Sequence, residues 1–227
     1  MAVPGAAARV IGERVRRRVM REPVAYILGR QAFRHLELHV DPRVLIPRPE
    51  TELLVDCATE MEEGARVHDL GTGSGAIALA IKHERPDMRV TASDASPPAI
   101  EVATANAERL GLRVRFAVAN GWADSLSPLW RGVTPPDLVV ANLPYVRKDE
   151  WDRLQPEIRL YEPRAALVAG ADGLDAIRAL VQAAPAGAQV ALEHAPDQAE
   201  DVRSLLVGGE TLVDLAGRER VTLGSVP

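Results

Sequence analysis

The stretch H-D-L-G-T-G-S-G-A-I-A-L-A, residues 68–80, joins a short apolar strand to a glycine-rich turn and then to the start of a helix. Gly71, Gly73 and Gly75 let the chain turn sharply and let a ligand approach the backbone closely. The first amide groups of the following helix point at whatever occupies that turn. This order of strand, glycine turn and helix predicts an α/β fold whose first strand ends at a nucleotide-like cofactor.

Outward from this stretch, short apolar strands alternate with helical periods from residue 66 to near the end of the chain. Strands are predicted at 67–70, 90–93, 114–118, 138–141 and 190–193, with helices after the first, second, fourth and fifth. Such alternation predicts βαβ crossovers and a mostly parallel sheet with helices on both faces. Residues 210–224 differ, because two alternating strands flank a Gly-Arg turn, and they predict an antiparallel hairpin at the end of the sheet.

The front of the chain is organised differently. Leu36, Leu38 and Val40 alternate with polar neighbours, which predicts a half-buried strand in a β-hairpin. Prolines then precede a helix that is expected to begin near Pro49. We therefore divide the chain into a short basic helical segment at 1–21, a hairpin and helix lining the substrate mouth at 22–65, and a cofactor-binding domain at 66–227.

Composition is that of an ordinary globular protein, since 47% of the 227 residues are hydrophobic and 26% are charged. No run of about 18 apolar residues is present to span a membrane, and the N-terminus lacks the apolar core of about 7–15 residues that a secretory signal needs. A single cysteine cannot form an internal disulfide. We therefore expect a cytoplasmic protein with no membrane association.

The net charge of −5 argues against a protein that binds nucleic acid through its overall field. One basic cluster stands out in R-V-R-R-R-V-M-R, made of Arg14, Arg16, Arg17, Arg18 and Arg21. This cluster could contact RNA or an acidic partner, but we interpret it as the solvated face of a short helix. No stable complex with nucleic acid is expected.

The glycine turn alone leaves the class of cofactor open. Gly71-x-Gly73-x-x-Ala76 also fits the dinucleotide pattern, and Asp94, at the end of the second strand, could accept ribose hydroxyls in either case. Asp69 favours S-adenosylmethionine, because a carboxylate beside the turn suits an ammonium group better than a pyrophosphate.

Two side chains after the third strand support the same interpretation. Asn120 and Trp122 put an amide and an indole at the carboxyl edge of the predicted sheet. Adenine could stack on the indole and form a hydrogen bond with the amide. They give a second reason to favour S-adenosylmethionine over a dinucleotide.

The stretch N-L-P-Y, residues 142–145, ends the fourth strand with an amide, a rigid corner and a ring, and it resembles the corner of the amino-methyltransferases. Asn142 Oδ1 and the Leu143 carbonyl are both acceptors, able to take the two N–H groups of one planar NH2 group. Pro144 fixes the backbone, and Tyr145 offers a face to a flat substrate. The same four residues could also form a tight turn that merely ends a buried strand.

A pattern of seven segments extends over most of the chain. In order they are E-P-V-A-Y-I-L-G (22–29), F-R-H-L-E-L-H-V (33–40), L-I-P-R-P-E-T-E (45–52), D-L-G-T-G-S-G-A-I-A-L-A (69–80), N-L-P-Y-V (142–146), Y-E-P-R-A-A-L (161–167) and G-R-E-R-V-T-L-G (217–224). Together they resemble the protein-(glutamine-N5) methyltransferases of the HemK/PrmC group, which methylate the glutamine of the Gly-Gly-Gln loop in peptide chain release factors.

The resemblance implies a Rossmann-like, seven-stranded class I S-adenosylmethionine-dependent methyltransferase fold with the last strand antiparallel. It also implies a release factor as substrate and S-adenosylhomocysteine as product. The substrate amide is then expected at Asn142, Leu143, Pro144 and Tyr145. The cofactor is expected at Asp69, Leu70, Gly71, Thr72, Gly73, Gly75, Asp94, Asn120, Trp122 and Asn142, with no metal ion.

Three departures from the family pattern leave other substrates open. Leu143 stands where proline is usual, so that N-L-P-Y also resembles the rRNA adenine dimethyltransferases, and Asn120 stands where aspartate is common. Only residues 1–21 precede the first matching segment, where the family has a helical domain. A diverged paralogue would methylate a small metabolite, another protein or a nucleobase amino group. The sequence is also compatible with a non-catalytic cofactor-binding scaffold and, more distantly, with a nicotinamide oxidoreductase.

Several further residues have two interpretations each. His35 and His39 could share a strand face, but no third ligand is in view, so a metal site is not expected there. Cys57 is interpreted as a core residue rather than a nucleophile. The side chains that could either brace the site or only stabilise loops are Arg48, Glu50, Glu162, Glu193 and His194.

Overall fold

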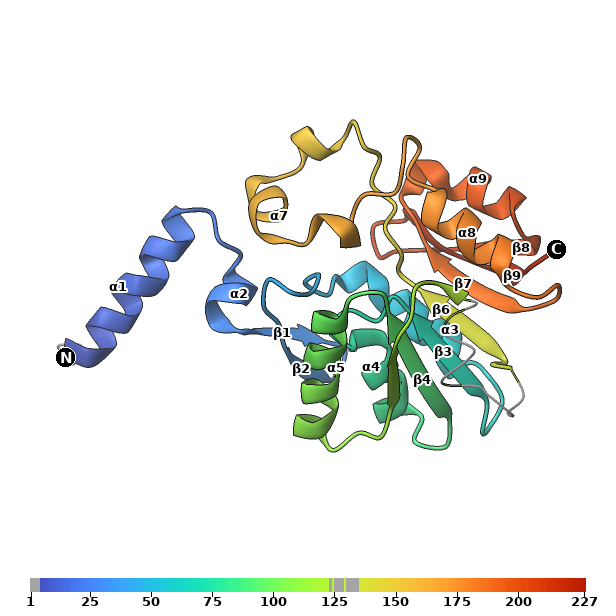
Figure 1. Ribbon diagram of the computed structural model, residues 1–227, viewed down its shortest axis with the longest axis horizontal. Coiled ribbons are helices and arrows are strands. Elements are labelled where there is room, and N and C mark those ends of the chain that lie inside the picture. Colours follow the sequence, from blue (N-terminus) through green and yellow to red (C-terminus); the bar gives the residue numbers. More distant parts are fainter. Residues whose placement is uncertain (1–4, 123, 125–128, 130–134) are drawn as a thin grey trace.

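Seven strands form the central sheet of the computed structural model, which describes residues 5–122, 124, 129 and 135–227 (Figure 1). Their order is β5-β4-β3-β6-β7-β9-β8. The strands are β3 (Arg66–Leu70), β4 (Arg89–Asp94), β5 (Arg115–Val118), β6 (Leu138–Ala141), β7 (Gln189–Glu193), β8 (Val207–Val213) and β9 (Glu219–Ser225). The first five pair in parallel, whereas β9 is antiparallel to both β7 and β8. The predicted parallel sheet with an antiparallel final strand is confirmed.

Helices cover both faces of this sheet (Figure 1). After the front of the chain, the α-helices in the described ranges are α3 (Glu52–Thr59), α4 (Ala76–Glu84), α5 (Pro97–Leu110), α7 (Pro156–Tyr161), α8 (Asp175–Ala183) and α9 (Ala199–Ser204). Short 3-10 helices are η1 (Pro49–Thr51), η2 (Trp151–Arg153), η3 (Arg164–Ala166) and η4 (Pro196–Gln198). The helices predicted after β3, β4, β6 and β7 are all present, and the helix expected near Pro49 begins as η1 and continues as α3.

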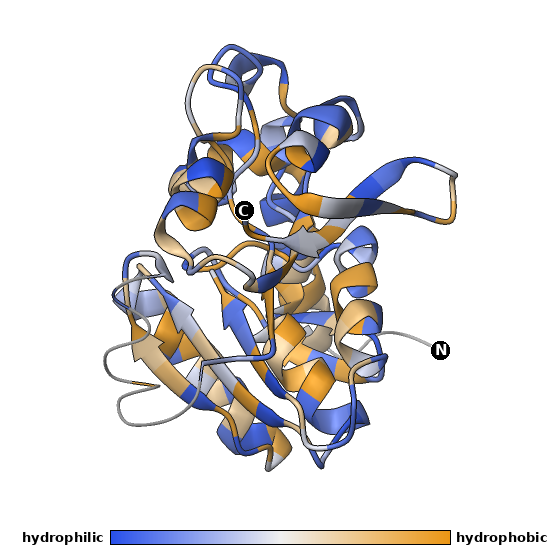
Figure 2. Ribbon diagram, turned by 90° about the vertical axis from the view of Figure 1, so that its right-hand side faces the viewer, coloured by the Kyte–Doolittle hydropathy of each residue, from blue (hydrophilic) through white to orange (hydrophobic). Residues whose placement is uncertain are grey.

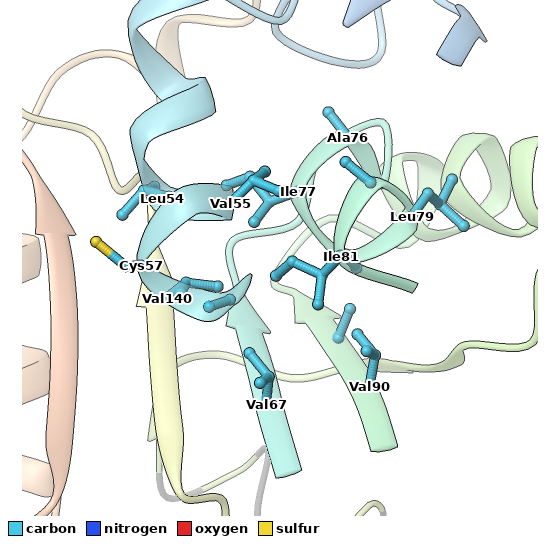
Figure 3. Packing of buried hydrophobic residues seen from close by; sticks show 14 of the residues in the cluster. Leu54, Val55, Cys57, Val67, Ala76, Ile77, Leu79, Ile81, Val90 and Val140 are labelled. Carbon is cyan, nitrogen blue, oxygen red and sulfur yellow. The ribbon is translucent and has the colours of Figure 1, made fainter. Parts of the chain in front are cut away.

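The sheet is buried on both faces, as a parallel sheet between helices must be. On β6, Leu138 and Val140 belong to the apolar cluster under α3 and α4, whereas Val139 and Ala141 belong to the cluster under α8 and α9. Figure 3 shows the first cluster, in which Cys57 lies among core residues as predicted. Figure 2 shows the same arrangement as apolar residues gathered along the strands and the helices beside them.

The front of the chain forms α1 (Gly5–Val19), α2 (Val24–Leu28) and a separate hairpin of β1 (Arg30–Phe33) and β2 (Leu36–His39). β1 and β2 pair antiparallel, which confirms the predicted hairpin. α1 projects away from the rest of the molecule and has no buried residue (Figure 1). None of the helices in the described ranges is long and apolar enough to cross a membrane.

The arginine cluster at the end of α1 is more than a solvated helix face. Arg18 and Arg21 both donate to the Glu157 carboxylate of α7, at 2.8 and 2.7 Å. Arg17 forms an ion pair with Glu22. The predicted exposure is confirmed for Arg18 and Arg21, and their ion pairs with Glu157 also connect the end of α1 and the residues after it to α7.

Candidate active site

The carboxyl ends of four neighbouring strands form one edge of the sheet. Leu70, at the end of β3, pairs with Ser93 of β4 and with Ala141 of β6. Ala141 in turn pairs with Leu192 of β7. The residues that come next on these strands are Gly71, Asp94, Asn142 and Glu193. The strand order reverses between β3 and β6, and a reversal of this kind opens a ligand crevice in α/β sheets.

The glycine turn after β3 lies directly against the corner after β6. Gly71 has a φ of +80°, a backbone conformation that favours glycine. A Cβ atom added there would lie 3.1 Å from Leu143 Cδ2 and 3.7 Å from the Asn142 carbonyl oxygen. The Gly71 and Thr72 amides donate to the Ser93 carbonyl at 2.9 and 3.0 Å. The turn is therefore held to β4 on one side and packed on Leu143 on the other.

Asp69 lies beneath the glycine turn and is fully buried. Its Oδ2 atom accepts from the Thr72 hydroxyl at 2.6 Å and from the Ala78 amide, in the first turn of α4, at 3.1 Å. Its Oδ1 atom is buried without a hydrogen-bond partner in the described part of the chain. Burial raises the pKa of this carboxyl to about 7. A buried acceptor without a partner suits a cationic donor from a ligand.

Asp94, just beyond Ser93, fixes both the glycine turn and the start of α5. Its Oδ2 atom accepts from the Gly73 amide at 2.9 Å, and its Oδ1 atom accepts from the Ser96 amide at 2.8 Å. Burial raises the pKa of this carboxyl. Each carboxylate oxygen can accept more than one hydrogen bond, so Asp94 retains capacity for the hydroxyl groups of a ribose.

Of the two side chains after β5, Trp122 differs from the prediction. Trp122 is only 2% exposed and packs in the cluster under α8 and α9. It therefore does not offer an exposed ring on which adenine could stack, because the large apolar indole is drawn into the core instead. Asn120 is exposed, so its side-chain amide is accessible to a ligand, and its contact with adenine stays a prediction.

The corner at residues 142–145 is held from behind by side chains of other segments. Asn142 Nδ2 donates to the Thr51 hydroxyl at 3.0 Å, and the Tyr145 hydroxyl donates to Glu193 Oε1 at 3.1 Å. The Tyr145 carbonyl accepts from Gln198 Nε2 at 2.9 Å. Burial, followed by the nearby Glu193 charge, raises the pKa of the Tyr145 hydroxyl. Tyr145 is therefore a neutral donor that is fixed at both ends.

The remaining two residues of the corner shape its surface. The Leu143 side chain is partly buried: it packs against the cluster under α8 and α9 and lies beside Gly71. Pro144 lies half-buried between Leu143 and Tyr145. On the other side of the turn, Gly75 packs closely on α5, with an added Cβ 3.2 Å from Ala103 Cβ.

A small pocket of about 40 Å³ opens in front of this corner. It is lined by Leu45, Arg48, Asn142, Leu143, Tyr145, Val146, Ala166 and Leu167. Arg48 is held there by an ion pair with buried Glu162, which also accepts from the Ile46 amide at 3.0 Å. Glu162 thus anchors the P-R-P-E-T-E segment over the pocket. A cavity measured in this way needs about 10–15 Å³ to hold one water molecule, so the pocket has room for a small group such as the tip of one side chain.

Two residues that contact the corner were missed by sequence reasoning. Thr51 belongs to the P-R-P-E-T-E segment, so the motif itself was an available signal. Gln198 follows no motif, and only the tertiary structure places it behind Tyr145. Of the two residues suspected at the end of β7, Glu193 contacts the corner, whereas His194 pairs with Thr222 of β9 at 2.8 Å.

His39, one of the two histidines considered for a metal site, has other hydrogen-bond partners. The His39 ring forms hydrogen bonds with the Gly29 carbonyl at 2.9 Å and with Asp41 at 3.2 Å. No group of three or more His, Cys, Asp or Glu side chains with the spacing of a metal site occurs among the residues that the structure describes. Glu50, which could brace the site or only stabilise a loop, contacts Arg218 at 3.3 Å on the side of β9.

Comparison with known proteins gives two kinds of similarity. The family model for the Methyltransferase small domain matches residues 49–154. The chain is 47% identical over 218 residues to the Release factor glutamine methyltransferase of Neisseria gonorrhoeae, covering 92% of this chain and 78% of that protein. It is 44% identical over 218 residues to the protein of the same name from Xylella fastidiosa, covering 90% and 77%. A solved structure, a methyltransferase from Pyrococcus furiosus, shares the fold with a TM-score of 0.55 at 18% identity, covering 93% and 96%.

Proposed function

Because this chain belongs to the release factor glutamine methyltransferase family, we propose that it methylates the side-chain amide of the glutamine in the Gly-Gly-Gln loop of a peptide chain release factor. The enzyme is a methyltransferase that depends on S-adenosylmethionine. When bound, this cofactor supplies an electrophilic methyl group on a positively charged sulfur. The observation that carries the substrate proposal is the corner at residues 142–145, where Asn142 and Leu143 line a small pocket.

The crevice between β3 and β6 fits the cofactor. Asp69 has a buried oxygen without a partner in the described ranges, and it would accept from the ammonium group of the cofactor. Asp94 would accept from the ribose hydroxyls. Gly71 and Gly73 would let the cofactor approach the backbone, because no side chain projects from the turn at these positions. Asn120 is the candidate for contact with adenine.

The corner would activate a poor nucleophile by orientation. An amide nitrogen reacts weakly because its lone pair is delocalised into the carbonyl. Asn142 Oδ1 and the Leu143 carbonyl would accept the two N–H groups of the substrate amide, so that the nitrogen faces the crevice. Both dipoles also point their negative ends at the nitrogen, where positive charge grows during the reaction. The surplus proton can leave to solvent after transfer, so the corner needs no strong base.

A methyl-transfer assay with labelled S-adenosylmethionine and purified release factor tests this proposal. We expect label on the wild-type factor and none on a factor whose Gly-Gly-Gln glutamine is replaced by alanine. Equal label on both factors would mean that the methyl group is accepted at another position of the release factor. No label on either, with cofactor binding intact by calorimetry, would favour a metabolite, another protein or a nucleobase as acceptor, which the identity to the two relatives does not support.

Cofactor affinity is expected to rise with pH up to about 7, because Asp69 must be ionised to accept from an ammonium group. Burial raises the pKa of this carboxyl from 3.8 to about 7, so that it is protonated in the free protein at pH 5. Below that pKa, binding must displace the proton, and the affinity should fall by at most about tenfold per pH unit. Calorimetry at pH 5, 6, 7 and 8 measures this slope. Asp69→Asn is the control that should abolish it, and a flat wild-type profile would contradict the role of Asp69.

A further inference from the structure

A buried carboxylate lies directly behind the substrate corner. Glu193, at the end of β7, is 2% exposed, and its Oε1 atom accepts from the Tyr145 hydroxyl at 3.1 Å. Its Oε2 atom is buried and has no hydrogen-bond partner in the described part of the chain, so it can still accept a hydrogen bond. The hydroxyl of Thr51, itself 4% exposed, lies close enough to lower the pKa of Glu193, together with Tyr145 and Arg220. Burial acts in the opposite direction and dominates, since it raises this pKa to about 7.

When Glu193 is ionised, hydrogen bonds that link Asn142, Thr51 and Glu193 can run in only one direction, with each group donating to the next. A carboxylate accepts hydrogen bonds and cannot donate them. The Thr51 hydroxyl has a single proton, so if that proton is directed to Glu193, the Thr51 oxygen must act as an acceptor towards Asn142. It does so in this structure, taking the Nδ2–H group of Asn142 at 3.0 Å. Asn142 Oδ1 is then the atom left for the pocket.

We infer that Glu193 and Thr51 are positioning residues that set the orientation of the Asn142 amide, so that its oxygen rather than its NH2 group faces the substrate. The inference rests on the proposed function, because only an acceptor at this position can take an N–H group of a glutamine amide. If the side-chain amide of Asn142 were rotated by about 180°, its NH2 group would face the NH2 group of the substrate, and the two donors would repel. Glu193 fixes Tyr145 through the same carboxylate.

A gain in stability does not explain why a carboxylate is buried at position 193. Burial of a charge that is incompletely paired destabilises a folded protein. Glu193→Gln removes the charge with almost no change in shape, and its carbonyl can still accept from Tyr145. Its new NH2 group, however, would donate to the Thr51 oxygen. The Thr51 proton would then be free to turn to Asn142, so the direction of the hydrogen bonds would no longer be fixed. The variant should therefore keep its fold and lose much of its activity.

Kinetics of four variants tests the inference with release factor as substrate. Glu193→Gln and Thr51→Val should each lower kcat by about tenfold or more, with the KM for S-adenosylmethionine changed at most a few-fold. The Tm of Glu193→Gln should equal or exceed that of the wild type. Thr51→Ser, which keeps the hydroxyl, should retain the wild-type kcat. Thr91→Val is the matched control, because Thr91 is an equally buried threonine on β4 that bonds to His68. Wild-type kcat in both test variants, or a fall that follows only the loss of folded protein, would overturn the inference.

A second measurement works without any substrate. The side-chain amide of Asn142 can be assigned in a ¹⁵N NMR spectrum by its disappearance in Asn142→Ala. We expect one of its protons to exchange slowly in the wild type and in Thr51→Ser, and both to exchange fast or shift in Thr51→Val and Glu193→Gln. An unchanged signal in those two variants refutes the inference even if the wild type methylates no release factor. Failure of the wild-type assay alone refutes the proposed function instead.

Discussion

Replacement of Asn142 by alanine should reduce turnover by about 10³-fold, while the affinity for S-adenosylmethionine changes at most a few-fold. The loss is expected to be large because one side chain supplies both the orientation of the substrate nitrogen and a dipole aimed at its growing positive charge. The fold should survive, since Asn142 is only half-buried and its one side-chain hydrogen bond in the described structure is to Thr51.

Single-turnover transfer of labelled methyl to the release factor measures this effect, because it separates the chemical step from product release. Calorimetry with the cofactor and a melting curve provide the controls for binding and folding. Turnover within about tenfold of the wild type would show that the corner does not hold the substrate amide. A parallel loss of cofactor affinity would instead place Asn142 chiefly in the cofactor site.

Gly71→Ala should weaken cofactor binding by at least about tenfold and reduce turnover further, because Gly71 joins the two halves of the site. The backbone at this position has a φ of +80°, which is strained for alanine. The new Cβ would also lie 3.1 Å from Leu143 Cδ2, so the Leu143 side chain or the glycine turn must give by a few tenths of an ångström. A shift of the turn would displace the cofactor relative to the substrate amide.

Gly64→Ala is the matched control for this substitution. Gly64 has a similar φ of +74°, but an added Cβ would meet nothing within 4 Å. Both variants should lose stability, by about 1 kcal/mol from the backbone strain alone. Only Gly71→Ala should change the Kd for the cofactor measured by calorimetry. Equal affinities in the two variants would mean that the turn after β3 does not contact the cofactor.

Much of the fold could be predicted from sequence because its signals are local. Apolar runs of four or five residues separated by helical periods gave the positions of β3, β4, β6 and β7, and alternation gave the hairpin of β1 and β2. β8 begins at Val207, three residues before the predicted strand, because Gly208 and Gly209 interrupt the alternation. The pairing with β9 is irregular at this point, as expected of a bulge at glycine.

Trp122 and the arginine cluster show where local reasoning fails. The same residues fit an indole at the sheet edge or in the core, and the choice depends on the apolar cluster that distant segments form around Trp122. In the same way, nothing near Arg18 and Arg21 in sequence indicates that Glu157 lies beside them. Burial and ion pairing depend on neighbours that are distant in the chain, so they cannot be obtained from the pattern of one segment.

The sequence by itself determined that a glycine turn follows one strand and that an amide corner follows another, because turn chemistry and strand period are properties of a few consecutive residues. Only the tertiary structure decided that these two strands are neighbours, and that Thr51 and Glu193 lie behind the corner. The physical reason is that strand order and register are chosen by the burial of both sheet faces at once. That choice brings together side chains 91 positions apart, such as Thr51 and Asn142, and fixes which of their atoms meet.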